Sequence, residues 1–407
     1  MKRSLLLIIG ILLVLLLLGI WVYMLFFNDS PRNTPPPDFS DLDFPSTTSN
    51  TPITSEPTND ATSTPTVALE DDVPLQQLTT TPIIGMQEIA TSSTASGTVW
   101  YIEPGTGHIY SINTVTGEEV RISGTTIPTS WQGSITPNGQ YVMMLSGQGT
   151  ARKTTVGLID TATSSETDLV VSSVTDVVHD FTATADNTFL YLTPTTNGAQ
   201  LREYYPETGA SLLVASVPFT EVAVAWGETA DAAHYLYPKA NSWLEGFLYE
   251  VRGGVLTRVP AAGYGLTAYG TEAGVLVGHQ DDSEYQSMLY FNDTNETVLT
   301  VVAFLPEKCT RDLDPNFLWC GSENSFSNQA PNDWYEGTRI HRDNLWKVDM
   351  GERSYTFAAN PTVEVGRELD MYNLQIGNSG DLYFQNKNDG TLWLYNTDTL
   401  PEKNFLE

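Results

Sequence analysis

Apolar and polar residues follow two different patterns along this chain. Residues 5–27 read LLLIIGILLVLLLLGIWVYMLFF, an uncharged run long enough to cross a bilayer as one helix. From about residue 84 onward, short runs of Val, Ile, Leu, Tyr and Trp alternate with turn residues, without a long helical periodicity. The first pattern predicts a transmembrane helix, and the second predicts an all-β domain.

The all-β region contains a repeat. An apolar-aromatic strand, an Asn or Asp, a short turn and another strand recur seven times, starting at Ile109, Val156, Leu201, Leu248, Leu289, Leu345 and Leu392. A second strand pair lies upstream of each copy, most clearly in GSITPNGQYVMMLS, residues 133–146. Four strands per repeat, at a spacing of roughly 45 residues, predict a seven-bladed β-propeller over residues 84–407. Two sandwiches in series would not give this fixed period.

One segment carries a family resemblance. ITPNGQYVMM, residues 135–144, resembles the S-P-D-G-K-Y-I-x-F signature of WD40-like propellers of the TolB type, with Thr136 in place of Ser and Asn138 in place of Asp. The chain is also similar to membrane-anchored bacterial propeller proteins that pair a C-x-C hairpin blade with a P-D-D-W-Y-Q-G-like loop. These resemblances imply the fold, because propellers of this type have many roles.

The flanks of the apolar run predict its orientation. Lys2 and Arg3 precede the run and Asp29 follows it, so residues 1–4 are expected in the cytoplasm and the C-terminal domain outside the cell membrane. A cleaved signal peptide would have a shorter apolar region and a small-residue cleavage site. This run instead ends in bulky residues, Trp21, Tyr23, Phe26 and Phe27. We therefore expect a single-pass signal anchor that is not cleaved.

Residues 28–83 are dominated by Pro, Thr, Ser and Asp. Such a segment cannot bury enough apolar surface to offset the entropy of ordering it. It predicts a disordered linker that separates the propeller from the membrane. Glycosylation of this stalk is a further interpretation of the same composition.

The net charge of −30, from 49 acidic and 19 basic residues, repels phosphate backbones. It argues against nucleic acid as a partner and favours cations or basic proteins.

Both cysteines of the chain, Cys309 and Cys320, fall in one predicted hairpin. They pair across the two strands if the turn centres on Asp314 and Pro315. An extracytoplasmic domain is in an oxidising setting, so we expect a structural disulfide. A redox-active pair is the alternative, but the C-x-x-C arrangement of such pairs is absent.

The largest departure from the repeat follows the second cysteine, in residues 321–343. Insertions of this kind map to one rim of a propeller, where partners bind. The candidate partner-binding residues are Phe326, Asp333, Trp334 and Tyr335. The alternative is that Trp334 packs against the next blade and anchors the loop.

No motif indicates a catalytic, cofactor or metal site. HQDDSE, residues 279–284, offers oxygen ligands without the spacing of a calcium loop, and the five histidines are scattered over five repeats. The primary hypothesis is a membrane-anchored module of the cell envelope that binds a protein or a wall glycan, or acts as a scaffold. An envelope hydrolase or lyase acting on glycan or peptide in the central channel is the alternative, and a structural component is the third.

Overall fold

The computed structural model describes residues 73–89, 97–160, 167–281 and 284–399. All of these residues belong to one compact unit. The predicted cytoplasmic N-terminus, the predicted membrane helix and most of the predicted linker lie outside the described residues. Among the helices within those residues, none has the length and apolar character needed to cross a membrane.

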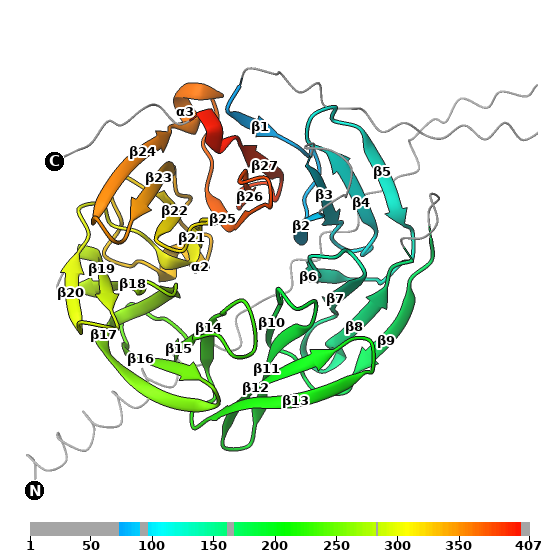
Figure 1. Cartoon of the computed structure of the whole chain (residues 1–407), viewed down its shortest axis with the longest axis horizontal. Helices are drawn as coiled ribbons and strands as arrows, with labels where there is room; N and C mark the ends of the chain where they lie inside the picture. The colour runs from blue at the N-terminus through cyan, green and yellow to red at the C-terminus, as the bar shows by residue number, and fades with distance from the viewer. Residues whose placement is uncertain (1–72, 90–96, 161–166, 282–283, 400–407) are drawn as a thin grey trace, which may run out of the picture. The chain divides into compact units, whose positions relative to one another are not determined.

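The described residues form four-stranded antiparallel sheets that follow one another around a ring (Figure 1). Blade 1 consists of β2 (Gly85–Ile89), β3 (Thr98–Ile102), β4 (Ile109–Asn113) and β5 (Glu119–Ser123). Blade 2 consists of β6 (Ser130–Ile135), β7 (Tyr141–Ser146), β8 (Lys153–Leu158) and β9 (Val170–Val174), with a 3₁₀ turn, η1 (Gly149–Ala151). Blade 3 consists of β10 (Asp180–Ala183), β11 (Phe189–Thr195), β12 (Gly198–Tyr205) and β13 (Ala210–Val217).

Blades 4 and 5 share a strand. Blade 4 contains β14 (Val222–Ala225), β15 (His234–Pro238) and β16 (Glu245–Arg252), and blade 5 contains β18 (Val275–Asp281), β19 (Glu284–Phe291) and β20 (Glu296–Leu299). The 16-residue strand β17 (Val255–Gly270) is the outer strand of blade 4 in its first half and the inner strand of blade 5 in its second half. The two blades therefore form one seven-stranded sheet.

Blade 6 consists of β21 (Cys309–Arg311), β22 (Phe317–Ser322), β23 (Asn344–Asp349) and β24 (Ser354–Ala359). A 3₁₀ turn, η2 (Pro306–Lys308), precedes it, and the short helix α2 (Asn332–Tyr335) lies between β22 and β23. Blade 7 has β25 (Met371–Ile376), β26 (Leu382–Asn386) and β27 (Leu392–Tyr395), flanked by α3 (Pro361–Glu364) and η3 (Thr397–Thr399).

The fourth strand of blade 7 comes from the other end of the described chain. β1 (Leu75–Gln77) pairs with β27 in the register Leu75 with Tyr395, and Figure 1 shows the two strands side by side. The sequence placed residues 75–83 in the linker and expected a closing strand downstream of Leu392. The linker boundary is corrected, because β1 begins at Leu75 and supplies the fourth strand of blade 7. The end of the segment in which the sequence placed that strand, residues 400–407, lies outside the described residues. Three residues among prolines and threonines carry too little alternation to predict a strand.

The hydrophobic core is divided among the junctions between blades. Seven clusters of buried side chains each join two neighbouring blades, including the pair formed by blades 7 and 1. This distribution follows from the burial of apolar side chains on both faces of each sheet. It confirms the predicted all-β propeller and gives seven four-stranded blades.

Leu75 should report on closure of the ring, because it is buried between blades 6 and 7 with Trp319, Leu345 and Trp393. We expect Leu75→Ala to lower the free energy of unfolding by about 2–5 kcal/mol, through lost burial and the cavity left behind. Urea denaturation of the full chain measures this change. Val115→Ala, at a position that is 56% exposed, is the matched control and should change stability by less than about 0.5 kcal/mol. Equal stability of the two variants would contradict a closing role for β1.

Candidate functional site

The predicted disulfide is present. Cys309 and Cys320 are register partners on β21 and β22, with their Cα atoms 4.1 Å apart and their sulfurs bonded. The turn lies where the sequence placed it, because the amide of Phe317 donates to the carbonyl of Asp314. Both cysteines are buried in the cluster between blades 5 and 6. Burial there supports the structural interpretation over the redox one.

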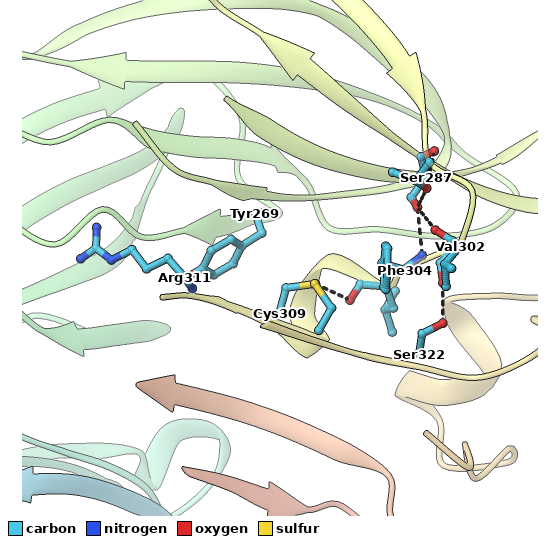
Figure 2. The surroundings of a disulfide bond; sticks show 11 residues. Tyr269, Ser287, Val302, Phe304, Cys309, Arg311 and Ser322 are labelled. Atoms are coloured by element: carbon cyan, nitrogen blue, oxygen red, sulfur yellow. Dashed lines mark hydrogen bonds between the residues drawn. A yellow bond between two sulfur atoms is a disulfide. The ribbon is translucent and has the colours of Figure 1, made fainter. Parts of the chain in front are cut away.

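The disulfide reinforces an unusually short strand. β21 has three residues and three register pairs, so its ladder alone holds the inner edge of blade 6 weakly. Figure 2 shows Arg311 extending away from Cys309, next to Tyr269, whose hydroxyl accepts from the Arg311 amide at 3.2 Å. On the other side, Ser322 donates to the carbonyl of Ala303 at 2.7 Å. Blade 6 is therefore attached to blade 5 at both ends of its first hairpin.

A buried ion-pair network lies immediately before β21. Lys308 is fully buried, and its Nζ lies 2.6 Å from Oδ2 of Asp343 and 2.6 Å from Oδ1 of Asp370. The backbone amide of Met371 also donates to Oδ2 of Asp343, at 2.7 Å. Because Asp343 precedes β23 and Asp370 precedes β25, one lysine joins blade 6 to blade 7.

The two carboxylates of this network differ in acidity. Burial raises the pKa of Asp343 to about 6, even though Lys308 pulls it down. Burial also acts on Asp370, but the charge of Lys308 and the hydrogen bonds from Lys308 and Trp334 outweigh it and leave the pKa below its ordinary value. Asp370 is thus the carboxylate that stays ionised beside Lys308.

Residues 323–343, called the insertion below, connect β22 to β23 and include α2. The insertion is anchored by Trp334, which is 5% exposed and whose Nε1 donates to Oδ1 of Asp370 at 2.8 Å. Lys387, from blade 7, lies 4.0 Å from the centre of the indole ring, and Lys308 lies 5.2 Å from it. Cations over an indole face are stabilised by the ring quadrupole.

The remaining predicted loop residues divide between interior and surface. Phe326 is half-buried between Tyr285 and His341, at ring distances of 4.7 and 5.2 Å. Asp333 is buried and accepts hydrogen bonds from Ser327 and from the backbone of the loop itself. Only Tyr335 is exposed, at 42%. The structure thus gives Trp334 the packing role that was its alternative in the sequence, and it places Phe326 and Asp333 in packing contacts as well. Partner binding by these residues stays a prediction.

The insertion reaches across blade 5 to blade 4. Oδ1 of Asn332 accepts from the amide of Ser242 at 2.7 Å, in the loop between β15 and β16. Gly265 lies under the insertion with φ +59°, and a Cβ there would lie 2.7 Å from Cδ of Pro331 and 3.3 Å from Ser242. Only glycine fits both this backbone conformation and this close approach.

Exposed apolar side chains gather beside this contact. Trp243 and Leu244 are 73% and 65% exposed, and Tyr264 on β17 is 51% exposed. The amide of Gly265 donates to the carbonyl of Leu244 at 3.2 Å, which places Tyr264 next to the Trp243–Leu244 loop. We call Trp243, Leu244 and Tyr264 the rim patch. Loops between second and third strands and connections between blades open on the same rim, because strand directions alternate within each blade.

The sequence reasoning missed the rim patch. The segment NSWLEG, residues 241–246, places Trp and Leu between two strands, and that pair could have drawn attention. Isolated apolar residues on a surface are common, however, and their grouping depends on the ring.

Tyr335 contacts a carboxylate, Glu307, that has no counterion within the described part of the chain. The Tyr335 hydroxyl donates to Oε1 of Glu307, in η2, whereas Oε2 is buried and has no hydrogen-bond partner among the described residues. Burial raises the pKa of Glu307, and the nearby hydroxyls of Tyr335, Thr267 and Tyr237 offset only part of the rise. Although part of the Tyr335 side chain is exposed, its hydroxyl is buried, and this burial together with the charge of Glu307 holds the pKa of Tyr335 well above its ordinary value, so the hydroxyl remains a donor.

Another carboxylate, the half-buried Asp180 on β10, has hydrogen-bond partners for both of its oxygens. Its two oxygens accept from Gln132 at 3.2 Å and from Trp226 at 2.9 Å. These bonds join blades 2, 3 and 4, and burial raises the pKa of Asp180. Asp180 therefore has a structural role at the inner edge of the sheets.

His341 is buried between Phe326 and Trp334, and burial together with the charge of Lys308 lowers its pKa to about 3. It is thus neutral at physiological pH. Within the described part of the chain, no three His, Cys, Asp or Glu side chains converge as a metal site would require.

Comparisons with known proteins give the fold. No family model matches the chain, and no curated protein matches it. Among solved structures, YCF48 bound to D1 peptide aligns with a TM-score of 0.53 and 12% identity, over 81% of this chain and 99% of that one. Oligogalacturonate lyase in complex with manganese aligns with a TM-score of 0.52 and 11% identity, over 81% and 93%.

The oligogalacturonate lyase of Vibrio parahaemolyticus aligns similarly, with a TM-score of 0.51 and 11% identity, over 81% of this chain and 94% of that one. TolB from Acinetobacter baumannii is also matched, with a TM-score of 0.40 and 11% identity, over 62% and 59%. The three likenesses with TM-scores above 0.5 agree with the β-propeller fold that the sequence predicted.

Replacing both cysteines with alanine tests the contribution of the disulfide. A closed loop with a sequence separation of 11 residues predicts a loss of about 3 kcal/mol in unfolding free energy, through the gain in entropy of the unfolded chain. Urea denaturation measures the loss, and non-reducing peptide mapping of the wild type checks the bond. Free thiols at both positions in the native protein would contradict the assignment.

Lys308→Met tests the ion-pair network. Two buried carboxylates then lack their cation, and we expect a loss of about 3–5 kcal/mol near neutral pH. The raised pKa of Asp343 means that the folded state retains a proton between about pH 4 and 6 that the unfolded state releases, so this group lowers stability as pH rises through that window. Without Lys308 this decline should steepen.

Urea denaturation at pH 5 and pH 8 should therefore give a larger loss for Lys308→Met at pH 8. Lys153→Met, at an exposed lysine, is the control and should be nearly neutral at both pH values. A loss that is the same at pH 5 and pH 8 would contradict the electrostatic account.

Proposed function

We propose that this protein is a membrane-anchored, extracytoplasmic propeller that binds a protein partner of the cell envelope through the rim of blades 4 to 6. The observation that carries the proposal is the rim patch, three large side chains that are each more than half exposed and that stand on neighbouring backbone segments. Exposed aromatic side chains that bury on association are the usual energetic anchors of protein interfaces.

The surroundings of the rim patch are rigid. Ser242 is held by Asn332, Gly265 is enclosed by Pro331 and Ala330, and Trp334 fixes α2 to blade 7. A loop that is already ordered loses less entropy when a partner binds. The insertion therefore contributes to the proposed binding surface mainly by ordering the loop that carries the rim patch, whose own residues come from blades 4 and 5.

The charge of the surface favours a basic or mixed partner. The net charge of the chain is −30, and Glu245 and Glu336 are exposed close to the rim patch and α2. Electrostatic attraction between oppositely charged surfaces speeds association and selects partners. A partner surface with apolar and basic side chains would complement both the rim patch and the negative charge around it.

The location rests on the sequence. The uncharged run of residues 5–27, preceded by Lys2 and Arg3, supports a signal anchor with the propeller outside the membrane. The disulfide agrees with an oxidising compartment. Residues 28 to about 72 would then be the linker that separates the propeller from the membrane.

Two related hypotheses remain beside this one. YCF48 is a propeller of similar structure that was solved with a bound peptide, which shows a peptide on this fold in another protein. The oligogalacturonate lyases share the fold at 11% identity, which transfers no catalytic residue to this chain. Glycan binding and the hydrolase or lyase activity therefore stay predictions from the sequence.

Site-specific photocrosslinking in native membranes tests the proposal. A photoreactive amino acid at position 243 should give a discrete crosslinked protein band that remains in the membrane pellet after alkaline carbonate extraction. The same amino acid at position 115, which is exposed in a turn on the opposite rim, should not give that band. Recovery of identical bands from both positions, or loss of the protein from the pellet, would contradict the rim or the anchor respectively.

A further inference from the structure

Glu307 and Lys308 are neighbours in η2, but among the described residues only Lys308 has partners of opposite charge. Lys308 has two carboxylates within 2.6 Å, so its charge is compensated inside the protein. Glu307 has no cation within ion-pair distance among the described residues. Buried carboxylates are normally paired, because removing a charge from water without compensation is costly. The missing counterion of Glu307 needs a physical explanation.

The groups around Glu307 are suited to a cation. Tyr335 donates to Oε1, while Oε2 faces no donor within hydrogen-bond distance. Tyr237 and Tyr285 are buried nearby and act on the same carboxylate, and the Tyr285 hydroxyl lies 3.3 Å from that of Thr267. A carboxylate among aromatic rings provides both the charge and the ring faces that bind ammonium and guanidinium groups.

The only ligand that Glu307 has from the insertion is also the most exposed residue of α2. Tyr335 is 42% exposed and is the last residue of a helix of four residues, and that helix is anchored separately by the hydrogen bond from Trp334 to Asp370. Outward rotation would uncover Oε1 of Glu307. The site lies beside the rim patch, because Asn332 of the same helix contacts Ser242, next to Trp243.

We propose that Glu307 is the receptor for a basic side chain of the protein partner, which displaces the Tyr335 hydroxyl and supplies the counterion that the fold lacks. This inference rests on the proposed function and deepens it by naming the chemistry of the partner. The partner presents an apolar or aromatic side chain to the rim patch and a lysine or arginine to Glu307. The charge of the bound cation favours the ionised form of Glu307, so binding releases a proton at mildly acidic pH.

Two tetrapeptides separate the contributions of the rim patch and of Glu307. Acetyl-Gly-Trp-Arg-Gly-amide carries both an aromatic side chain and a cation, and its counterpart with citrulline in place of arginine has nearly the same shape without the charge. Isothermal titration with the full chain in detergent at pH 8 should give tighter binding of the arginine peptide by at least about tenfold, the range of a charge-assisted hydrogen bond. The lysine peptide in a third titration distinguishes ammonium from guanidinium.

Two variants test whether Glu307 causes the preference for the arginine peptide over the citrulline peptide. In Glu307→Gln the ratio of the two affinities should fall to about one. In Glu118→Gln, the matched change at an exposed glutamate in the turn between β4 and β5 on the opposite rim, the ratio should be unchanged. Glu307→Gln should unfold at the same temperature as the wild type or higher, because it removes an uncompensated buried charge. The wild-type ratio should decrease as pH falls, because a protonated Glu307 cannot pair with the cation.

Failure of the inference and failure of the proposed function give different results. Trp243→Ala should weaken both peptides equally and preserve their ratio. If Trp243→Ala has no effect while the arginine preference persists, the rim patch is wrong and Glu307 stands. If the wild type binds both peptides equally, binds neither, or keeps its arginine preference in Glu307→Gln, the proposed role of Glu307 is wrong.

Discussion

The structure depends on the burial of both faces of every blade. A four-stranded sheet with apolar side chains on its two faces is unstable alone, and each of the seven core clusters needs the blades on both sides of it. A ring satisfies this requirement only when it is closed. Closure relies on the pairing of β1 with β27, so three residues near the start of the described chain complete the burial of a domain that extends to residue 399.

Blade 6 must also be attached to the blades on both sides of it, although its inner strand, β21, has only three residues. Three different interactions compensate for this short strand: the disulfide to β22, the ion pairs of Lys308 to Asp343 and Asp370, and the contacts of the Trp334 ring with two lysines. Together they fix the base of the insertion. The insertion in turn orders the loop of blade 4 that carries Trp243, so stability in one blade determines the shape of the surface two blades away.

Much of this could be predicted from the sequence, because it depends on local patterns. Strand alternation at a fixed period predicts the blades. A hairpin turn at Asp314 and Pro315 places Cys309 opposite Cys320 and so predicts their bond. The parts that were missed depend on the closed ring. β1 is too short to show a strand pattern, and the burial of Trp334 depends on its hydrogen bond to Asp370 in another blade. Glu307 and Lys308 are adjacent charged residues, and only the three-dimensional arrangement reveals that their partners differ.

The position of β1 has a mechanical consequence. If residues 5–27 hold the chain in a membrane, any tension between that anchor and a bound partner reaches the propeller through β1 before any other strand. β1 has three register pairs with β27, fewer than the five in each of the β2–β3 and β3–β4 pairings of the next blade. Under load the ring would therefore open at blade 7 first, so the strand that closes the propeller is also the joint that yields under force.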